Sequence, residues 1–138
     1  MMYDVVKQSL EEFIAANWTE TQVQYDNVAF NSDLYEEYAQ FTVRFGELIK
    51  RSLPKGCYRQ PGILIFTIKT KPDLGTARKL ALAADVATML TDVVVSPTPP
   101  LVAPSVTVKE PALFDDNRQR DGWVMAQLSF PFYYDLEI

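Results

Sequence analysis

Residues 39–69, which read AQFTVRFGELIKRSLPKGCYRQPGILIFTIK, decide the fold. The segment Ala39 to Phe45 alternates apolar and polar side chains, which is the pattern of a strand with one buried face. Gly62–Lys69 is apolar on both faces at its centre and predicts a second strand. Pro54-Lys55-Gly56 has the composition of a turn, and residues 47–53 can extend the first strand toward it. The stretch therefore predicts a long β-hairpin with its tip near Pro54-Lys55-Gly56.

Two helices are expected, one before and one after this hairpin. The first covers about Asp4 to Trp18, where apolar residues recur on one helical face: Val6, Leu10, Phe13, Ile14 and Trp18. The second covers Ala77 to Leu90, behind a cap at Thr76. It is apolar around most of its circumference, so we expect it to be buried on most sides against the sheet.

The remaining segments predict shorter elements. We expect extended chain at Val23–Val28, Val93–Val95 and Val106–Val108 and a turn at Asn31-Ser32-Asp33. The segment Ser96–Pro104 holds four prolines and predicts a surface loop. The run Asp115–Gly122 predicts a polar turn region.

The longest predicted strand begins at Trp123. Its alternation places one set of apolar residues on a single face: Val124, Ala126, Leu128, Phe130 and Phe132. Pro131 has no backbone donor, so we expect this strand to lie at a sheet edge or to bulge there.

The order helix, hairpin, helix, hairpin predicts an α+β fold in a single domain over residues 1–138. We expect a mostly antiparallel β-sheet, with two α-helices packed on one face and a long β-hairpin extension. The other face of the sheet would expose its polar rows, with Thr42, Arg44, Gln127 and Ser129.

Composition bounds the function. The chain has no histidine, which excludes Ser-His-Asp and Cys-His catalysis and histidine-based zinc sites. With a net charge of −5 and a pI of about 4.7, it lacks the basic character of a nucleic-acid-binding domain. A single cysteine, Cys57, forms no internal disulfide, and no apolar run suits a signal peptide or a membrane span. We expect a protein made in the cytoplasm that is not an enzyme, with no cofactor, no metal and no membrane partner.

Four local features have simple structural interpretations. Cys57 lacks a histidine base, although Lys55 and Arg59 could lower its pKa, so an unreactive thiol is favoured. The acidic pairs Glu36-Glu37 and Asp115-Asp116 do not match a calcium-loop spacing and are interpreted as solvated faces. Leu74-Gly75-Thr76 lacks the second glycine and the lysine of a phosphate-binding loop and is interpreted as a helix cap.

Two features suggest a partner. The basic cluster Lys50, Arg51, Lys55 and Arg59, with Tyr58 among them, is either a solvated hairpin rim or one side of an interface with acidic neighbours. A platform for single-stranded nucleic acid would need more aromatic residues on one face. The run Phe130-Pro131-Phe132-Tyr133-Tyr134 would expose aromatic surface on the face that is not buried, unless the first helix covers it.

Several motifs, taken in order, resemble one known family. The chain has a strand ending Phe41-Thr42-Val43-Arg44-Phe45, a hairpin arm opening Tyr58-Arg59-Gln60-Pro61-Gly62, and Gly75-Thr76 before an alanine-rich helix. It closes with a strand from Gly122-Trp123-Val124 to the aromatic run. This order resembles the tail terminator, or tail completion, proteins of long-tailed bacteriophages, the group with a lambda minor-tail-protein-U-like fold.

The resemblance implies a structural protein of the virion. Such proteins form a ring, usually of six subunits, on the last ring of the tail tube, and they present a surface to the head-to-tail connector. DNA would pass through the ring without sequence-specific binding. A head-completion or tail-tube protein is the alternative, and an enzyme or small-ligand-binding domain is a third reading. The residues expected in subunit or partner contacts are Lys50, Arg51, Lys55, Tyr58, Arg59, Trp123, Phe132 and Tyr134.

Overall fold

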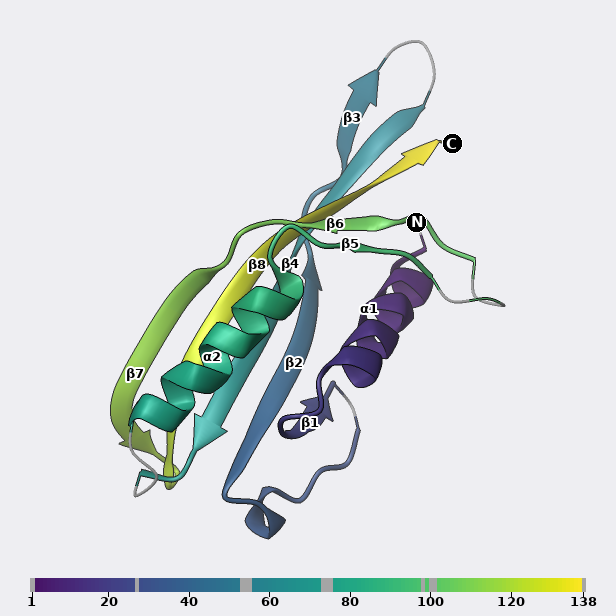
Figure 1. Cartoon of the computed structure of the whole chain (residues 1–138). Helices are drawn as coiled ribbons and strands as arrows, with labels where there is room; N and C mark the ends of the chain where they lie inside the picture. The colour runs from purple at the N-terminus through teal and green to yellow at the C-terminus, as the bar shows by residue number, and fades with distance from the viewer. Residues whose placement is uncertain are drawn as a thin grey trace.

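The computed structural model describes residues 2–26, 28–52, 56–72, 76–97, 99 and 102–137. Two helices, a 3-10 turn and an eight-stranded sheet lie within these ranges (Figure 1). Their bounds are α1 Tyr3–Asn17, β1 Gln22–Tyr25, η1 Ser32–Leu34, β2 Glu37–Phe45, β3 Ile49–Ser52, β4 Cys57–Thr70, α2 Thr76–Leu90, β5 Val94–Val95, β6 Val106–Val108, β7 Ala112–Arg120 and β8 Trp123–Glu137.

The two long strands β4 and β8 form the centre of the sheet. They pair antiparallel along their whole length, from Cys57 opposite Glu137 to Thr70 opposite Val124. On the other side of β4 lie β2 and then β3, and on the other side of β8 lie β7 and then β6. β1 pairs with β2 in parallel and β5 pairs with β6 antiparallel. The predicted α+β class and mostly antiparallel sheet are confirmed.

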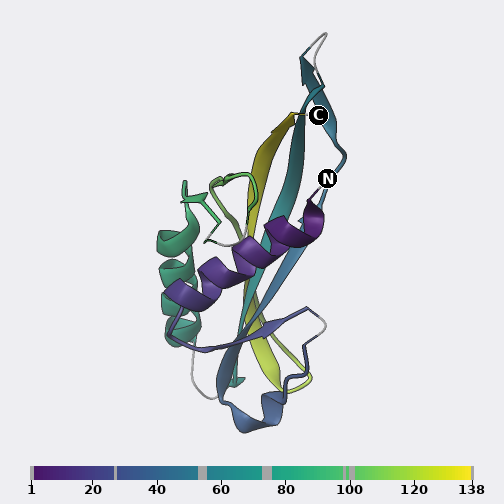
Figure 2. The same cartoon turned by 90° about the vertical axis from the view of Figure 1, so that its right-hand side faces the viewer.

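Both helices cover the same face of the sheet (Figure 2). Every second side chain of β4 and β8 points toward them, so the alternation in the sequence becomes one continuous core. The buried residues of this core include Leu64, Phe66 and Ile68 of β4, Ala126, Leu128, Phe130 and Phe132 of β8, Val6, Leu10 and Ile14 of α1, and Leu82, Val86 and Leu90 of α2. The opposite face carries half-buried Thr42, Gln127 and Ser129 and exposed Arg44, as expected.

The predicted polar turn at Asp115–Gly122 is wrong. Residues 112–120 form strand β7, which pairs antiparallel with β8. The turn is limited to Asp121 and Gly122, whose φ angles of 53° and 84° are the positive values that a two-residue hairpin turn requires. The polar sequence is compatible with a strand because β7 pairs on one side with β8 and leaves most of its side chains exposed.

The expectation that Pro131 marks a sheet edge is also wrong. β8 is paired on both sides, by β4 and by β7 or β6. The carbonyl oxygen of Pro131 accepts a hydrogen bond from the backbone N–H of Lys109 at 2.8 Å, so the nitrogen of Pro131 faces the same side. Along β8, pairing with β7 stops at Ser129 and pairing with β6 starts at Phe132. The backbone N–H that Pro131 lacks would fall in the gap between these two strands.

The bounds of the predicted helices and strands elsewhere are confirmed to within a few residues, and residues 96–104 hold no helix or strand where they are described. The expectation that the second helix is buried on most sides is wrong: one face of α2 is buried, and Leu80, Ala81 and Ala84 are exposed. Pro54 and Lys55 of the predicted hairpin tip and Leu74 and Gly75 of the predicted helix cap lie outside the described residues.

Candidate assembly interface

A ribbon of three strands extends past the helices, and we call it the arm (Figures 1 and 2). It consists of β3, residues 57–61 of β4 and residues 133–137 of β8. Ile49 pairs with Arg59 and Lys50 with Tyr58, while Arg59 pairs in turn with Asp135 and Tyr58 with Leu136. The long hairpin that the sequence predicted therefore exists, with β2 and β3 as the two parts of its first strand.

The body and the arm meet at Gln60, a fully buried polar residue. Its side-chain amide donates to the carbonyl oxygens of Gly46, at 2.7 Å, and Pro61, at 2.8 Å. Its own oxygen accepts from the Tyr3 hydroxyl at 3.3 Å. These bonds satisfy backbone groups at the place where β2 has ended and β3 has not begun.

Gly62 is required at the same place by close packing. A Cβ atom there would lie 2.3 Å from Cζ of Phe132 and 2.5 Å from the carbonyl oxygen of Arg44. The Phe132 ring also contacts Phe45, with ring centroids 5.9 Å apart. The base of the arm is therefore a tightly packed joint.

One face of the arm is held together by its own charges. The Arg59 guanidinium donates to both carboxylate oxygens of Asp135, at 2.8 and 3.0 Å, and lies 3.9 Å from the ring centroid of Tyr133. The hydrogen bonds to Asp135 raise the pKa of Arg59 above its ordinary value. Lys109 approaches the same ring, 5.6 Å from its centroid. Arg59 is thus partly used within the chain before any partner binds.

The opposite face of the arm continues the core face of β4 and β8 beyond the helices. It carries Lys50, Tyr58 and Leu136 in one cross-strand row. Tyr58 and Leu136 are half-buried, and Lys50 is exposed and forms no ion pair with a described residue. We call this row the basic row of the arm.

The structure divides the eight expected contact residues into two groups. The arm carries Lys50, Tyr58 and Arg59 and the backbone of Arg51. Lys55 lies outside the described residues. Trp123, Phe132 and Tyr134 are 8%, 2% and 1% exposed, so they belong to the interior of this chain. The expectation of an open strand edge at 123–132 is also wrong, because β8 is paired on both sides, with β4 and with β7.

The buried aromatic residues have identifiable neighbours. Trp123 packs edge-on against Tyr38, with centroids 4.9 Å apart, and the ammonium of Lys71 lies 4.1 Å from its ring centroid. Burial, with a smaller contribution from Tyr3, raises the pKa of Tyr134 to about 12. Of the C-terminal aromatic run, Tyr133 lies on the face turned away from the core, and the chain's own Arg59 packs against it.

Strand β7 presents a free edge that the sequence analysis missed. Within the described chain it pairs with β8 alone, and Leu113 and Phe114 are each 54% exposed. Lys79 of α2, fully buried, anchors it by contacts with Asp115 at 2.6 Å and Asn117 at 2.7 Å. The dipeptide Asp121-Gly122 is the signal that could have revealed this strand.

The acidic pairs are not simply solvated faces. Glu37 is half-buried and forms a two-point contact with Arg78, at 2.7 and 3.0 Å. Asp116 is buried, and hydrogen bonds from the backbone and side chain of Arg118 lower the pKa of its carboxyl group. No group of three or more Cys, Asp or Glu side chains in the described ranges is placed to hold a metal ion.

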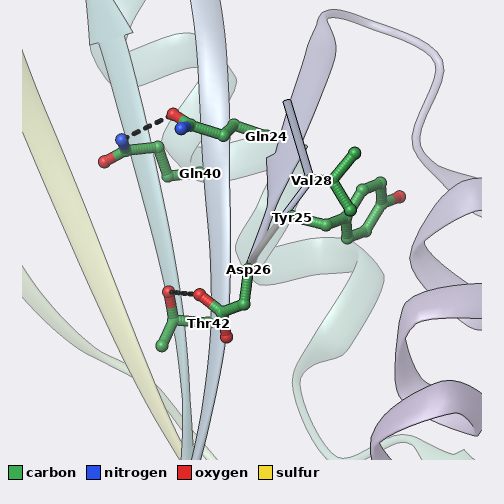
Figure 3. Close-up of a pocket in the computed structure, with 6 residues that line it drawn as sticks. All are labelled: Gln24, Tyr25, Asp26, Val28, Gln40 and Thr42. Atoms are coloured by element: carbon green, nitrogen blue, oxygen red, sulfur yellow. Dashed lines mark hydrogen bonds between the residues drawn. The ribbon is translucent and has the colours of Figure 1, made fainter. Parts of the chain in front are cut away.

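Two hollows flank β1. One, of about 360 Å³, is lined by polar residues; Gln40 donates to Gln24 at 2.8 Å and Thr42 to Asp26 at 3.1 Å (Figure 3). The other, of about 280 Å³, lies between α1 and β1, and we call it the acidic groove. Its lining is Gln8, Glu11, Glu12, Ala15, Tyr25 and Val28.

The comparisons with known proteins show the fold and no family. No protein-family model and no curated protein matches the sequence. A solved structure superimposes on 97% of this chain and 96% of its own, with a TM-score of 0.70 at 14% identity, and the name of that protein states no activity, ligand or partner. Among the residues that the structure describes, no helix has the length and apolar character needed to cross a membrane.

Proposed function

We propose that this protein is a structural assembly protein of the tail terminator type. Copies of the chain would close into a ring, of six subunits in our proposal, on the end of a long phage tail tube. The ring would stop tube growth and offer its free side to the head-to-tail connector. Its place is the virion tail, and DNA would pass through it without sequence-specific contacts.

The arm is the observation that carries the proposal. The outer part of the arm lies beyond both helices, where Ile49, at 50% exposed, and Lys50 of β3 are exposed. A narrow ribbon of strands gains stability when another surface covers it. The outer edge of β3 also has unpaired backbone groups that another chain can use.

The order of motifs along the chain supports the same function. The resemblance to tail terminators rests on the hairpin arm, the alanine-rich helix and the final aromatic strand, and these segments become the arm, α2 and β8. Head-to-tail contacts between identical copies close into a ring when the rotation per copy divides a full turn.

The test is the mass of the purified protein over a range of concentrations, combined with electron microscopy in the presence of tail tubes. We expect closed rings in solution or at tube ends. A protein that stays monomeric at every concentration and never decorates tube ends would refute the proposal.

A tail-tube protein is the second candidate, favoured by the free edge of β7. Its exposed Leu113 and Phe114 give the chain another surface for self-association. A second surface allows rings to stack into a tube, whereas one head-to-tail contact alone closes a ring when the rotation per copy divides a full turn. Long filaments of the isolated protein would favour this candidate.

A further inference from the structure

We propose that the basic row of the arm, Lys50, Tyr58 and Leu136, docks into the acidic groove between α1 and β1 of a neighbouring copy. The inference rests on the proposed ring and names the two surfaces that join its subunits.

The groove combines apolar walls with carboxylates. Ala15, Tyr25 and Val28 supply the apolar part, and Val28 is 57% exposed. Glu11 and Glu12 lie along the rim on α1, where the spacing of Gln8, Glu11, Glu12 and Ala15 places all four side chains on one helical face. Partial burial raises the pKa of Glu11, which indicates a carboxylate with incomplete solvation.

Little positive charge within the chain neutralises this groove. Lys7 is the nearby cation, and it forms an ion pair with Asp26 at 3.1 Å. Glu12 accepts a hydrogen bond from the neutral amide of Gln8 at 3.2 Å. The three carboxylates of Glu11, Glu12 and Asp26 therefore face one described lysine, Lys7, and this part of the surface has a net negative charge.

The hairpin segment of the chain that contains β3 is basic, although the third strand of the arm holds Asp135 and Glu137 and Arg59 is already paired with Asp135. Residues 50–59 contain Lys50, Arg51, Lys55 and Arg59 and no acidic residue, in a chain whose net charge is −5. Six described basic side chains, those of Lys7, Arg59, Arg78, Lys79, Arg118 and Arg120, form an ion pair within the chain, whereas Lys50, like Arg44, Lys69, Lys71 and Lys109, forms none with a described side chain. Lys50 is therefore available for an acidic partner.

The apolar parts of the two surfaces also match. Tyr58 and Leu136 continue the core face of the sheet beyond the first turn of α1, and both side chains are only half-buried there. The half-buried ring of Tyr25 and the exposed side chains of Val28 and Ala15 offer an apolar surface to complete their burial. An apolar centre with opposite charges at the rim is the usual composition of a specific protein contact.

The positions of the two surfaces suit a ring. The arm extends beyond the N-terminal end of α1, while the groove lies farther along α1 and beside β1 (Figure 2). Because the arm and the groove are different patches of the molecule, a head-to-tail contact leaves one arm and one groove free to bind further copies, which a ring requires.

Charge reversal tests the inference. The arm variant carries Lys50→Glu, and the groove variant carries Glu11→Lys and Glu12→Lys. We expect each variant alone to weaken assembly about tenfold or more, because like charges would then face each other. A mixture of the two variants should recover assembly in a ring where they alternate. In such a ring the altered arm of one variant meets the altered groove of the other, and the unaltered arm meets the unaltered groove, so every contact joins opposite charges. Masses in solution report the result, and circular dichroism verifies that the variants are folded.

The matched control reverses two exposed acidic residues outside both surfaces, Asp33→Lys and Asp85→Lys, and should assemble like the unmodified chain. If the unmodified chain forms rings and neither variant changes them, the docking inference is overturned while the ring function stands. If the unmodified chain forms no rings even with tail tubes, both are overturned. If the groove variant loses binding of the tube protein instead of self-assembly, the groove belongs to another partner and the inference also fails.

Discussion

The side-chain amide of Gln60 lies 2.7 Å from the carbonyl oxygen of Gly46 and replaces a strand-to-strand hydrogen bond where the ladder between β2 and β4 stops. Gly46 in turn donates its backbone N–H to the carbonyl oxygen of Pro61 at 2.9 Å. A buried amide at this point satisfies polar groups that the interrupted ladder would leave unpaired. One buried side chain therefore satisfies a backbone group at the base of the arm, where β4 and β8 continue into it.

The first prediction concerns this amide. Gln60→Leu keeps a similar size but leaves the Gly46 carbonyl oxygen without the donor that the Gln60 amide supplies, so we expect a loss of about 1–3 kcal/mol in the free energy of unfolding. Urea denaturation measures it. Gln40→Leu is the matched control, because Gln40 is half-buried and bonds only to Gln24 among described side chains, and a change within about 0.5 kcal/mol is expected there. Equal effects for the two variants would contradict the special role of Gln60.

The second prediction concerns the joint at Gly62. Gly62→Ala should destabilise the protein by about 1–3 kcal/mol, since the added methyl group overlaps the Phe132 ring and the Arg44 carbonyl oxygen. At Gly46 the nearest atoms would lie 3.5 Å from a Cβ, so Gly46→Ala should be tolerated. Thermal unfolding of the two variants compares them. Combining Gly62→Ala with Phe132→Ala should not restore stability, because the overlap with the backbone oxygen remains and the ring leaves a cavity.

The sequence was informative where one face of an element is buried. The alternation from Ala39 to Phe45 and from Val124 to Phe132 and the helical spacing of Val6, Leu10 and Ile14 all depend on burial, and they predicted β2, β8 and α1. β7 was missed because its residues are mostly exposed, so no alternation marks it.

Contacts between distant residues could not be predicted in the same way. Burial of Lys79 is possible only because Asp115 and Asn117 reach it from another element. Likewise, Glu11 and Glu12 have the pattern of the polar side of a helix, and the groove exists because β1 and Val28 lie beside them. Trp123, Phe132 and Tyr134 were expected at an interface because the sequence does not show which strands lie on both sides of β8.

The third prediction separates the two partners of the Lys79 contact. Asp115→Ala would leave a fully buried ammonium without its carboxylate, and we expect a cost of about 3 kcal/mol or more. Lys79→Met should cost less, because the carboxylate of Asp115 is partly exposed and can be hydrated. Hydrogen exchange should show early opening of β7 in Asp115→Ala. A larger cost for Lys79→Met would show that the ammonium stabilises the fold chiefly through its bonds to Asn117 and the Asp116 carbonyl oxygen, which survive in Asp115→Ala.

The fourth prediction is a loss of stability in alkaline solution. In the folded chain the pKa of Tyr134 is raised to about 12, whereas an ordinary tyrosine has a value of 10.0. The unfolded chain therefore releases this proton first, and the contribution of Tyr134 is complete below pH 10 and is lost as the pH rises toward about 12. Tyr134→Phe cannot ionise, so its stability relative to the unmodified chain should increase over this interval. Urea denaturation at a series of pH values measures the difference, with Tyr133→Phe, on the opposite face of β8, as the matched control. A constant difference between Tyr134→Phe and the unmodified chain from neutral pH to pH 12 would show that the Tyr134 hydroxyl is solvated, and that the core at the base of the arm is open to water.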